Sequence, residues 1–352
     1  MRKFLIILSL VLITSCSSKE IPKEFALDDL VKRQGITYQI NSQVGFTGIA
    51  ARYHEGGHLK GLKEQITYKD GKLDGSFETY HLIGSAAGAI DDLLEVDLHQ
   101  QGRHQGGWSK GNYEDGEENG PFEVYYLNDQ LRIQNNWENG KLNGLATVFY
   151  RNGQLFSQHN WENDSRDGLS ESYFESGELM SKGVYKDGFH DGLWEEYYRT
   201  GKMSVLSNYR ARVLHGLFTK YYDDGKLWEK LNYKDGRLDG PFEYYYWGTG
   251  RLERTGIYKD GKLDGPFETY HQNGQLKSRG SYKNDKQYGL SKKYYENGQL
   301  RPKGNFKDGK LNGLQEGYLQ DGQIKGQLCY RNGEEVYISY CERLINNAIL
   351  QK

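Results

Sequence analysis

The residues that decide the fold are 258–281, which read YKDGKLDGPFETYHQNGQLKSRGS. They hold two turn signals, Asp-Gly at 260–261 and Asn-Gly at 273–274, because these residue types supply the positive φ angles that tight hairpin turns require. Between the signals, residues 266–270 alternate in polarity and are rich in aromatic side chains, which predicts a strand. Residues 276–281 form the expected return strand. The stretch therefore predicts one β-hairpin and the turn that leads to the next.

Copies of this hairpin fill most of the chain, and they are needed because two strands alone are marginally stable in water. Taking Gly265 as the anchor, equivalent glycines recur, mostly 24 residues apart, at Gly48, Gly75, Gly120, Gly144, Gly168, Gly192, Gly216, Gly240, Gly265, Gly289 and Gly313. An aromatic residue stands five positions after each anchor glycine. A fixed period is the signature of a repeat array. We therefore predict an all-β fold, an elongated single-layer antiparallel sheet of about eleven tandem β-hairpins with a short C-terminal cap.

The composition agrees with many short strands rather than one compact core. Among 352 residues there are 45 glycines and 29 tyrosines but only 5 prolines, and the hydrophobic share is 36%. Tyrosine with glycine suits half-buried strands joined by many turns, whereas a compact globule of this length needs more aliphatic residues. The net charge of −2 gives no general attraction to nucleic acid, so we expect no nucleic-acid partner.

The N-terminus reads as a processing segment rather than part of the fold. Two basic residues precede an apolar run at 4–13, which is too short to cross a bilayer as a helix, and the run leads to Cys16. This segment resembles a bacterial lipobox, in which the cysteine is lipidated. We expect 1–15 to be a signal peptide, Cys16 to carry the lipid and 16–30 to be a tether, which would place the protein in the bacterial cell envelope, lipid-anchored at the outer membrane. The alternative is an ordinary secretory signal with a chance cysteine.

The array is expected to span 31–333, interrupted by an insertion at about 81–107. The insertion either carries a function, as insertions in arrays often do, or is a tolerated surface excursion. Residues 334–352 are expected to form the cap. Within it, 337–340 predict a last strand and 342–350 a helix that covers the open sheet edge.

Two cysteines remain after Cys16, namely Cys329 and Cys341. In an exported protein two such cysteines favour a disulfide, which would clip the C-terminal end of the array. The alternative is two free thiols in a poorly oxidising compartment. A zinc site is disfavoured because two cysteines without a nearby histidine cannot complete its coordination shell.

Alternation along each first strand sorts its side chains onto two faces. The residue after the anchor glycine is mostly Leu or Pro, and it shares a face with the aromatic residue five positions after that glycine. We expect this Leu/Tyr ladder to be the structural face, because cross-strand aromatic pairs stabilise a sheet. The opposite face is more variable, and we expect it to bind partners. Its candidate binding residues are Phe77, Phe122, Trp194, Phe218, Phe242, Phe267 and His271.

The units at 258–270 and 68–80, YKDGKLDGPFETY and YKDGKLDGSFETY, resemble the bacterial variant of the MORN repeat. The resemblance covers Gly48 to about Gly333. It implies an elongated, twisted antiparallel sheet of consecutive hairpins without catalytic residues. It also implies two roles seen among relatives, namely antitoxins in bacteria and scaffolds or membrane-associated proteins in eukaryotes.

The residues themselves indicate no enzyme, no cofactor and no metal site. There is no Gly-x-Ser-x-Gly elbow and no plausible Cys/His nucleophile pair, and turn chemistry accounts for the recurrent aspartates. Three hypotheses for function follow. The first is an envelope lipoprotein that binds or spaces an unknown protein partner, with the membrane reached through the N-terminal lipid. The second is an array that binds cell-wall glycan or peptidoglycan, and the third is an antitoxin-like component of a toxin–antitoxin system.

Overall fold

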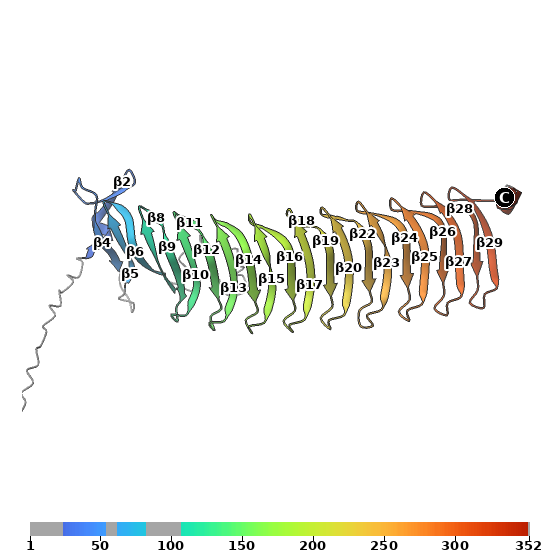
Figure 1. Ribbon diagram of the computed structural model, residues 1–352, viewed down its shortest axis with the longest axis horizontal. Coiled ribbons are helices and arrows are strands. Elements are labelled where there is room, and N and C mark those ends of the chain that lie inside the picture. Colours follow the sequence, from blue (N-terminus) through green and yellow to red (C-terminus); the bar gives the residue numbers. More distant parts are fainter. Residues whose placement is uncertain (1–23, 54–61, 82–106, 351–352) are drawn as a thin grey trace, which may run out of the picture. The chain divides into compact units, whose positions relative to one another are not determined.

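The computed structural model describes residues 24–53, 62–81 and 107–350 (Figure 1). The chain divides into two units, Met1–Gly120 and Pro121–Lys352, each of which is described by itself. The expected signal peptide, the lipidated Cys16 and nearly all of the expected insertion lie outside the described residues.

The first unit is a small antiparallel sheet whose first strand is covered by the N-terminal segment. Its elements are β1 (Glu24–Ala26), the 3-10 helix η1 (Leu27–Asp29), β2 (Leu30–Arg33), β3 (Ile36–Gln39), β4 (Gly48–Tyr53), β5 (Leu62–Lys69), β6 (Lys72–His81), β7 (Gly107–Glu114) and β8 (Glu117–Glu118). Strand β1 pairs in parallel with β4, and β2 and β3 form a separate hairpin. Strands β4 to β7 pair antiparallel in chain order.

The prediction that residues 16–30 form only a tether was wrong for its second half. Residues 24–30 fold onto the sheet as β1, η1 and the start of β2. Phe25 and Leu27 pack against a buried cluster of Phe46, Ala50 and Tyr68, so apolar burial fixes this segment. This segment is short and charged, so its two isolated apolar residues did not form a recognisable pattern.

The second unit is a single-layer antiparallel sheet, and its strands pair in chain order from β9 to β30 (Figure 1). The predicted all-β fold of tandem hairpins is confirmed. The strands are β9 (Gly120–Tyr126), β10 (Leu131–Glu138), β11 (Lys141–Leu142), β12 (Gly144–Phe149), β13 (Leu155–Glu162), β14 (Ser165–Tyr173), β15 (Leu179–Lys186), β16 (Phe189–Tyr197), β17 (Met203–Arg210), β18 (Val213–Leu214), β19 (Gly216–Tyr221), β20 (Leu227–Lys234), β21 (Arg237–Leu238), β22 (Gly240–Tyr245), β23 (Leu252–Lys259), β24 (Lys262–Tyr270), β25 (Leu276–Lys283), β26 (Lys286–Tyr294), β27 (Leu300–Lys307), β28 (Lys310–Tyr318), β29 (Ile324–Arg331) and β30 (Glu334–Val336).

Two kinds of turn alternate along this sheet. At the first, Asp260 and Gly261 both have positive φ (49° and 80°), as a two-residue hairpin turn with right-handed twist requires. At the second, Gly274 alone has positive φ (90°), while the Asn273 side chain accepts a hydrogen bond from the Gln275 amide (2.9 Å). The expectation of positive φ throughout Asn-Gly was therefore wrong for the asparagine, which acts through its side chain instead.

The first kind of turn is also bonded to the preceding copy. The Gly261 amide donates to the Leu238 carbonyl (2.8 Å), and the same bond recurs at successive turns. Where aspartate replaces the glycine, its carboxylate adds a second bond. The Leu142 amide donates to Asp164 (2.7 Å) and the Leu263 amide to Asp285 (2.7 Å). These replacements therefore strengthen the connection between neighbouring copies.

The residue two positions after each anchor glycine packs on one face of the sheet, and a glycine opposite makes room for large rings. Gly256 pairs with Phe242 on one neighbouring strand and with Phe267 on the other. A Cβ added at Gly256 would lie 2.8 Å from Phe242 Cε1 and 3.1 Å from Phe267 Cδ2. The glycine is therefore required for space at this position rather than for backbone conformation.

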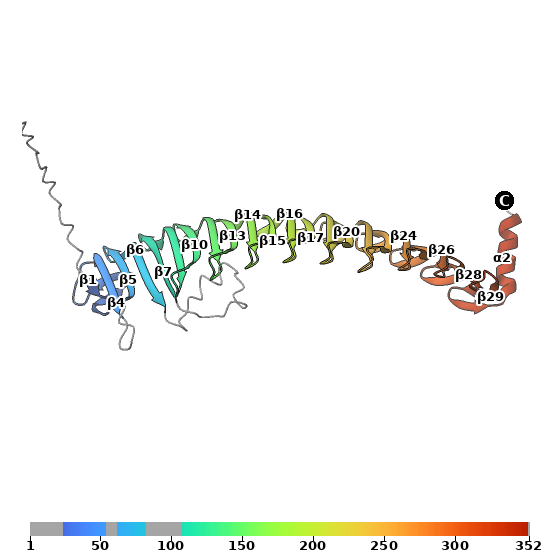
Figure 2. The ribbon, with the colours of Figure 1, turned by 90° about the horizontal axis from the view of Figure 1, so that it is seen from below.

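The second unit ends in a helix (Figure 2). A disulfide fixes this helix to the sheet. Helix α2 (Ile338–Leu350) follows β30, so the prediction of a strand at 337–340 was wrong, because the helix already begins within that stretch. Cys329 on β29 and Cys341 on α2 form a disulfide with Cα atoms 5.9 Å apart. Both cysteines are buried.

In the part of the chain that the structure describes, no helix has the length and apolar character needed to cross a membrane.

The glycine between two rings yields a stability prediction. Gly256→Ala should lower the free energy of unfolding by about 1–3 kcal/mol, because Phe242 and Phe267 must shift to admit the methyl group. Gly326→Ala is the control, since a Cβ there meets nothing within 4 Å. Urea titrations monitored by circular dichroism measure both variants. Equal midpoints for the two alanine variants would contradict the packing described.

Candidate functional site

The face that was expected to bind partners is the packed face of the sheet. Phe122, Trp194 and Phe242 are 6%, 8% and 2% exposed. Phe77, Phe218 and Phe267 are half-buried. The binding-face prediction was therefore wrong for Phe122, Trp194 and Phe242, and it stays a prediction for the three half-buried rings. We call this surface the aromatic face, meaning the residue two positions after each anchor glycine together with the aromatic residue that stands last but one in each return strand.

Rings that contact one another explain this burial. Trp194 lies 5.5 Å from Tyr185 between ring centroids, Phe242 lies 4.7 Å from Tyr258, and Phe267 lies 5.3 Å from Tyr282. A single-layer sheet has no second layer to cover its apolar side, so side chains on one face must cover each other. Alternation separated the two faces correctly, but their roles were reversed.

His271 belongs to a different series, which joins neighbouring copies. Its Nε2 atom lies 3.0 Å from the Tyr294 carbonyl oxygen in the next copy. Tyrosines at the equivalent position donate their hydroxyls in the same way, and we call these contacts the inter-repeat tyrosine bonds. They run from Tyr126 to Phe149 O (2.8 Å), Tyr150 to Tyr173 O (2.9 Å), Tyr198 to Tyr221 O (2.7 Å), Tyr222 to Tyr245 O (2.8 Å), Tyr246 to Tyr270 O (2.7 Å) and Tyr295 to Tyr318 O (3.0 Å). Sequence reasoning missed them, although an aromatic residue or histidine six positions after most anchor glycines is a visible signal.

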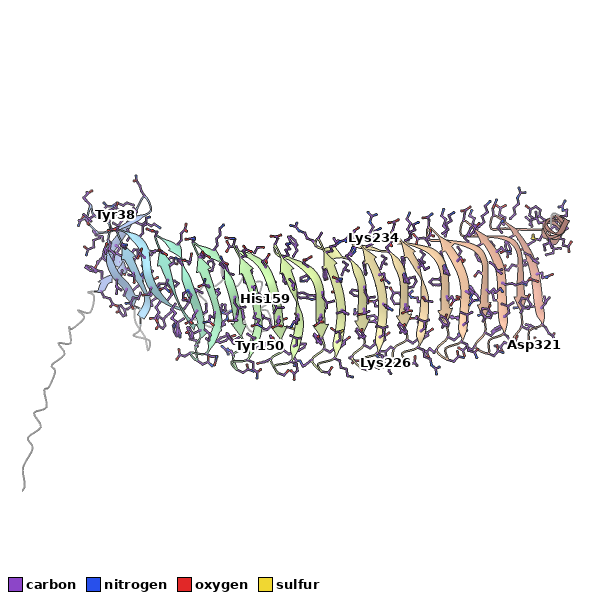
Figure 3. All side chains as sticks on the ribbon, viewed as in Figure 1. Tyr38, Tyr150, His159, Lys226, Lys234 and Asp321 are labelled. Carbon is purple, nitrogen blue, oxygen red and sulfur yellow. A yellow bond between two sulfur atoms is a disulfide. The ribbon has the colours of Figure 1, made fainter. Side chains whose placement is uncertain are left out.

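One histidine is held neutral on the aromatic face. His159 Nδ1 lies 2.7 Å from Ser170 Oγ, opposite the buried Ala146 (Figure 3). Burial, with a smaller effect from the Arg166 charge, lowers the pKa of His159 to about 4. The folded protein therefore keeps this imidazole uncharged at neutral pH, as a packed polar group rather than a cation.

The opposite face carries the exposed apolar side chains. Leucines that directly follow the anchor glycine are 50% (Leu145), 40% (Leu169), 52% (Leu193), 40% (Leu217) and 48% (Leu290) exposed. These five residues define what we call the leucine row, and the surface that holds them is the leucine face. The expectation that the Leu/Tyr ladder is the structural face was therefore wrong for its leucines. Each lies beside an anchor glycine at a bulge, where the regular pairing of the strand with the preceding strand is interrupted.

Ion pairs stabilise the polar part of the leucine face. Glu268 accepts hydrogen bonds from the Tyr270 hydroxyl (2.5 Å) and from Arg279 Nε (2.7 Å). The Tyr270 hydroxyl and then Arg279 lower the pKa of Glu268, while its contact with the carboxylate raises the pKa of Tyr270 to about 12. Glu171 with Lys182 (2.9 Å) and Glu316 with Lys303 repeat the pairing in other copies. The tyrosines of the expected ladder therefore do have a structural role, through their hydroxyls.

Within the described residues, no group of three His, Cys, Asp or Glu side chains could hold a metal ion.

Comparison with known proteins assigns the repeat. A profile of the family described as MORN repeat variant matches residues 142–163, 166–187, 191–211, 214–235, 263–284, 287–308 and 311–332. No curated protein matches the chain.

Two solved structures show weak likeness. TcdB2-TccC3-Cdc42 is 11% identical, with 84% of this chain and 19% of that chain covered and a TM-score of 0.17. A porin-like protein from Bacteroides uniformis is 11% identical, with 75% of this chain and 93% of that chain covered and a TM-score of 0.14. This chain therefore spans about a fifth of the first of these proteins. Both TM-scores are too low to relate the folds.

The inter-repeat tyrosine bonds yield a second prediction. Phe174 occupies the position of the bonding tyrosines but has no hydroxyl. Phe174→Tyr should add a bond to the Tyr197 carbonyl and raise the free energy of unfolding by about 0.5–1.5 kcal/mol. Tyr198→Phe, one copy later, should lower it by a similar amount. Thermal unfolding of both variants tests this prediction. If Phe174→Tyr does not raise the unfolding temperature and Tyr198→Phe does not lower it, these bonds do not stabilise the array.

The repeat assignment and the architecture agree, since seven matched segments lie in phase along the tandem hairpins of the second unit. The chain belongs to the MORN-repeat proteins, with the repeat in its variant form.

Proposed function

We propose that this protein is a non-catalytic scaffold that binds a protein partner along its leucine row. The observation that supports this most is the exposure of five leucines at one repeated position, each between 40% and 52%. Scattered exposed apolar residues are normal on a protein surface, whereas a regular series of them is typical of an interaction site. MORN repeats, as a class, suggest protein or membrane interaction, and the leucine row agrees with the first of these.

The geometry of the row suits an extended partner. Each copy contributes two strands, so successive leucines are separated by about 9.6 Å across the strands. Ion pairs such as Glu268–Arg279 flank the row on the same face. A partner that lays apolar side chains across several copies would bury these leucines beside charges that already have partners, such as Glu268 and Arg279.

The four histidines of the second unit support a non-catalytic role because they have structural partners. His159 contacts Ser170, His190 contacts the Tyr185 hydroxyl (2.8 Å), and His271 contacts a backbone carbonyl. His215 lies 3.2 Å from Asp235. Each of these four histidines therefore has a contact within the sheet that accounts for one of its ring nitrogens.

We also propose that the protein is anchored in the bacterial cell envelope through a lipid on Cys16. The support comes from the sequence alone. A basic start, a short apolar run and the residues that lead to Cys16 together resemble a lipobox. Such an anchor would hold the array close to a membrane, where a long sheet can reach a partner away from the lipid surface.

The other two hypotheses have less support. Stacking of sugars on the predicted aromatic residues is disfavoured, because Trp194 and Phe242 are buried by their neighbours. An antitoxin role stays a prediction, and it conflicts with a lipid anchor because an antitoxin acts in the cytoplasm.

Replacing the leucine row should separate binding from folding. The triple variant Leu169→Ser, Leu193→Ser and Leu217→Ser should keep the wild-type unfolding temperature within a few degrees, because these side chains are half-exposed. It should lose the crosslinked partners that intact cells give for the wild type. Gln272→Ser with Gln320→Ser, at exposed turns, is the control and should retain them. Unchanged crosslinks in the triple variant would exclude the leucine row.

The anchor makes a separate prediction. Wild-type protein should incorporate labelled palmitate and sediment with membranes. Cys16→Ala should incorporate no label and become extractable in salt, because stable membrane binding requires more than one acyl chain and the variant carries none. Incorporation of label into Cys16→Ala, or a soluble and unlabelled wild type, would refute the proposed location.

A further inference from the structure

Four successive turns in the second unit each place two cations directly opposite each other. The pairs are Lys234 with Arg237, Lys259 with Lys262, Lys283 with Lys286, and Lys307 with Lys310. All eight side chains are exposed, and we call them the lysine row. Lys234 marks the long edge of the sheet beside which the row runs, whereas Lys226 and Asp321 lie along the other long edge (Figure 3).

This arrangement is unfavourable for the sheet itself, because like charges on directly opposed residues repel. Some other cations of the protein do have carboxylate partners: Lys182 lies 2.9 Å from Glu171 and Lys72 lies 3.4 Å from Asp115. Among the residues that the structure describes, no carboxylate forms an ion pair with any of the eight. A repulsion that recurs in four successive hairpins indicates a ligand that brings negative charge to the row.

The row lies on the leucine face rather than at the tips of the turns. Tyr258 packs against Phe242 on the aromatic face, and Tyr258 pairs with Leu263. The next pair along the two strands, Lys259 with Lys262, therefore points to the opposite face. The repeat carries the same geometry to the other three pairs.

We propose that the lysine row binds a linear anionic polysaccharide that lies across the strands and carries one acidic group per disaccharide. Each hairpin adds two strands, so successive cation pairs are about 9.6 Å apart, about the length of one extended disaccharide. The four pairs would then meet four consecutive acidic groups of one chain. This site is independent of the leucine row, and neither proposal requires the other.

Two other anionic partners fit the row less well. Each strand of duplex DNA presents a phosphate about every 3.4 Å along the helix axis, so most of its phosphates would face no cation pair. A membrane surface that approached the turn tips would meet the exposed Asp235, Asp260 and Asp308 between the cations. Spacing and orientation therefore favour the polysaccharide.

The experiment measures binding of full-length protein in detergent to hyaluronan, which has one carboxylate per disaccharide. Polygalacturonate, with a carboxylate on every sugar, neutral dextran, single-stranded DNA and vesicles with anionic lipid are the comparison ligands. Hyaluronan should bind most tightly, and its affinity should fall as salt rises. Tighter binding to DNA, to vesicles or to polygalacturonate would overturn the proposal, as would no binding to hyaluronan.

A variant that removes one cation from each pair gives the sharpest test. Arg237→Gln, Lys262→Gln, Lys286→Gln and Lys310→Gln together should weaken hyaluronan binding by about tenfold or more. The same variant should unfold at the wild-type temperature or higher, because four like-charge contacts are removed.

The matched control removes cations from the same face that already have carboxylate partners. Lys182→Gln, Arg279→Gln and Lys303→Gln together should leave hyaluronan affinity at the wild-type value. Equal loss of binding in both variants would show that net charge, not the row, attracts the polymer and would overturn the assignment.

Discussion

A sheet of one layer must bury its apolar side without a second layer, and the rest of this structure depends on that constraint. The apolar side is covered by side chains of neighbouring strands within the same sheet. Rings on one face cover the rings of the neighbouring copies, and small residues stand opposite large ones, as Gly256 does between Phe242 and Phe267 and Ser207 does beside Trp194. Burial of this kind needs a neighbour on each side, so a hairpin of this type gains stability only within an array.

Hydrogen bonds between copies, like the packing, stabilise each copy through its neighbours. Turn glycines donate to the previous copy, and tyrosine hydroxyls donate to the next, so both long edges of the second unit are connected. Each series joins only copies that are neighbours in the array. The two series also explain why the edges tolerate charge: the backbone groups at the turns already have partners, which leaves the lysines free to remain exposed.

Much of this could be predicted from the sequence, because period and turn chemistry are local properties. The hairpins, their antiparallel order and the two glycine turns were all correct in outline. The roles of the two faces were not, because alternation shows which residues share a face but not which face is covered. In an ordinary sheet the leucines would be inside. Here the bulge at the anchor glycine displaces the leucine, and a ring two positions after that glycine occupies the covered surface.

The N-terminal segment and the inter-repeat tyrosine bonds were missed for a related reason. Phe25 and Leu27 are isolated apolar residues in a charged stretch, and only their fit against Phe46 identifies them. The tyrosine hydroxyls bond to backbone in the following copy, 23 or 24 residues away, a distance that no local pattern expresses. The cation pairs were visible in the sequence as a basic residue on each side of a two-residue turn, but their repulsion became evident only with the register of the strands.

One copy is 25 residues long, and it shows how an array in which each copy contacts only its neighbours accommodates a change in length. Its extra residue lies in the turn at 246–251, where Gly248 and Gly250 both have positive φ (76° and 66°), and the tyrosine bond from Tyr246 to the next copy is kept. A change in length is therefore absorbed at the tip of a turn without disturbing register on either side. By the same reasoning, duplication or deletion of a whole copy would keep the backbone register of the remaining copies and change side-chain contacts only at the new junction. The length of such a protein can thus change during evolution in steps of one hairpin while its surfaces stay the same.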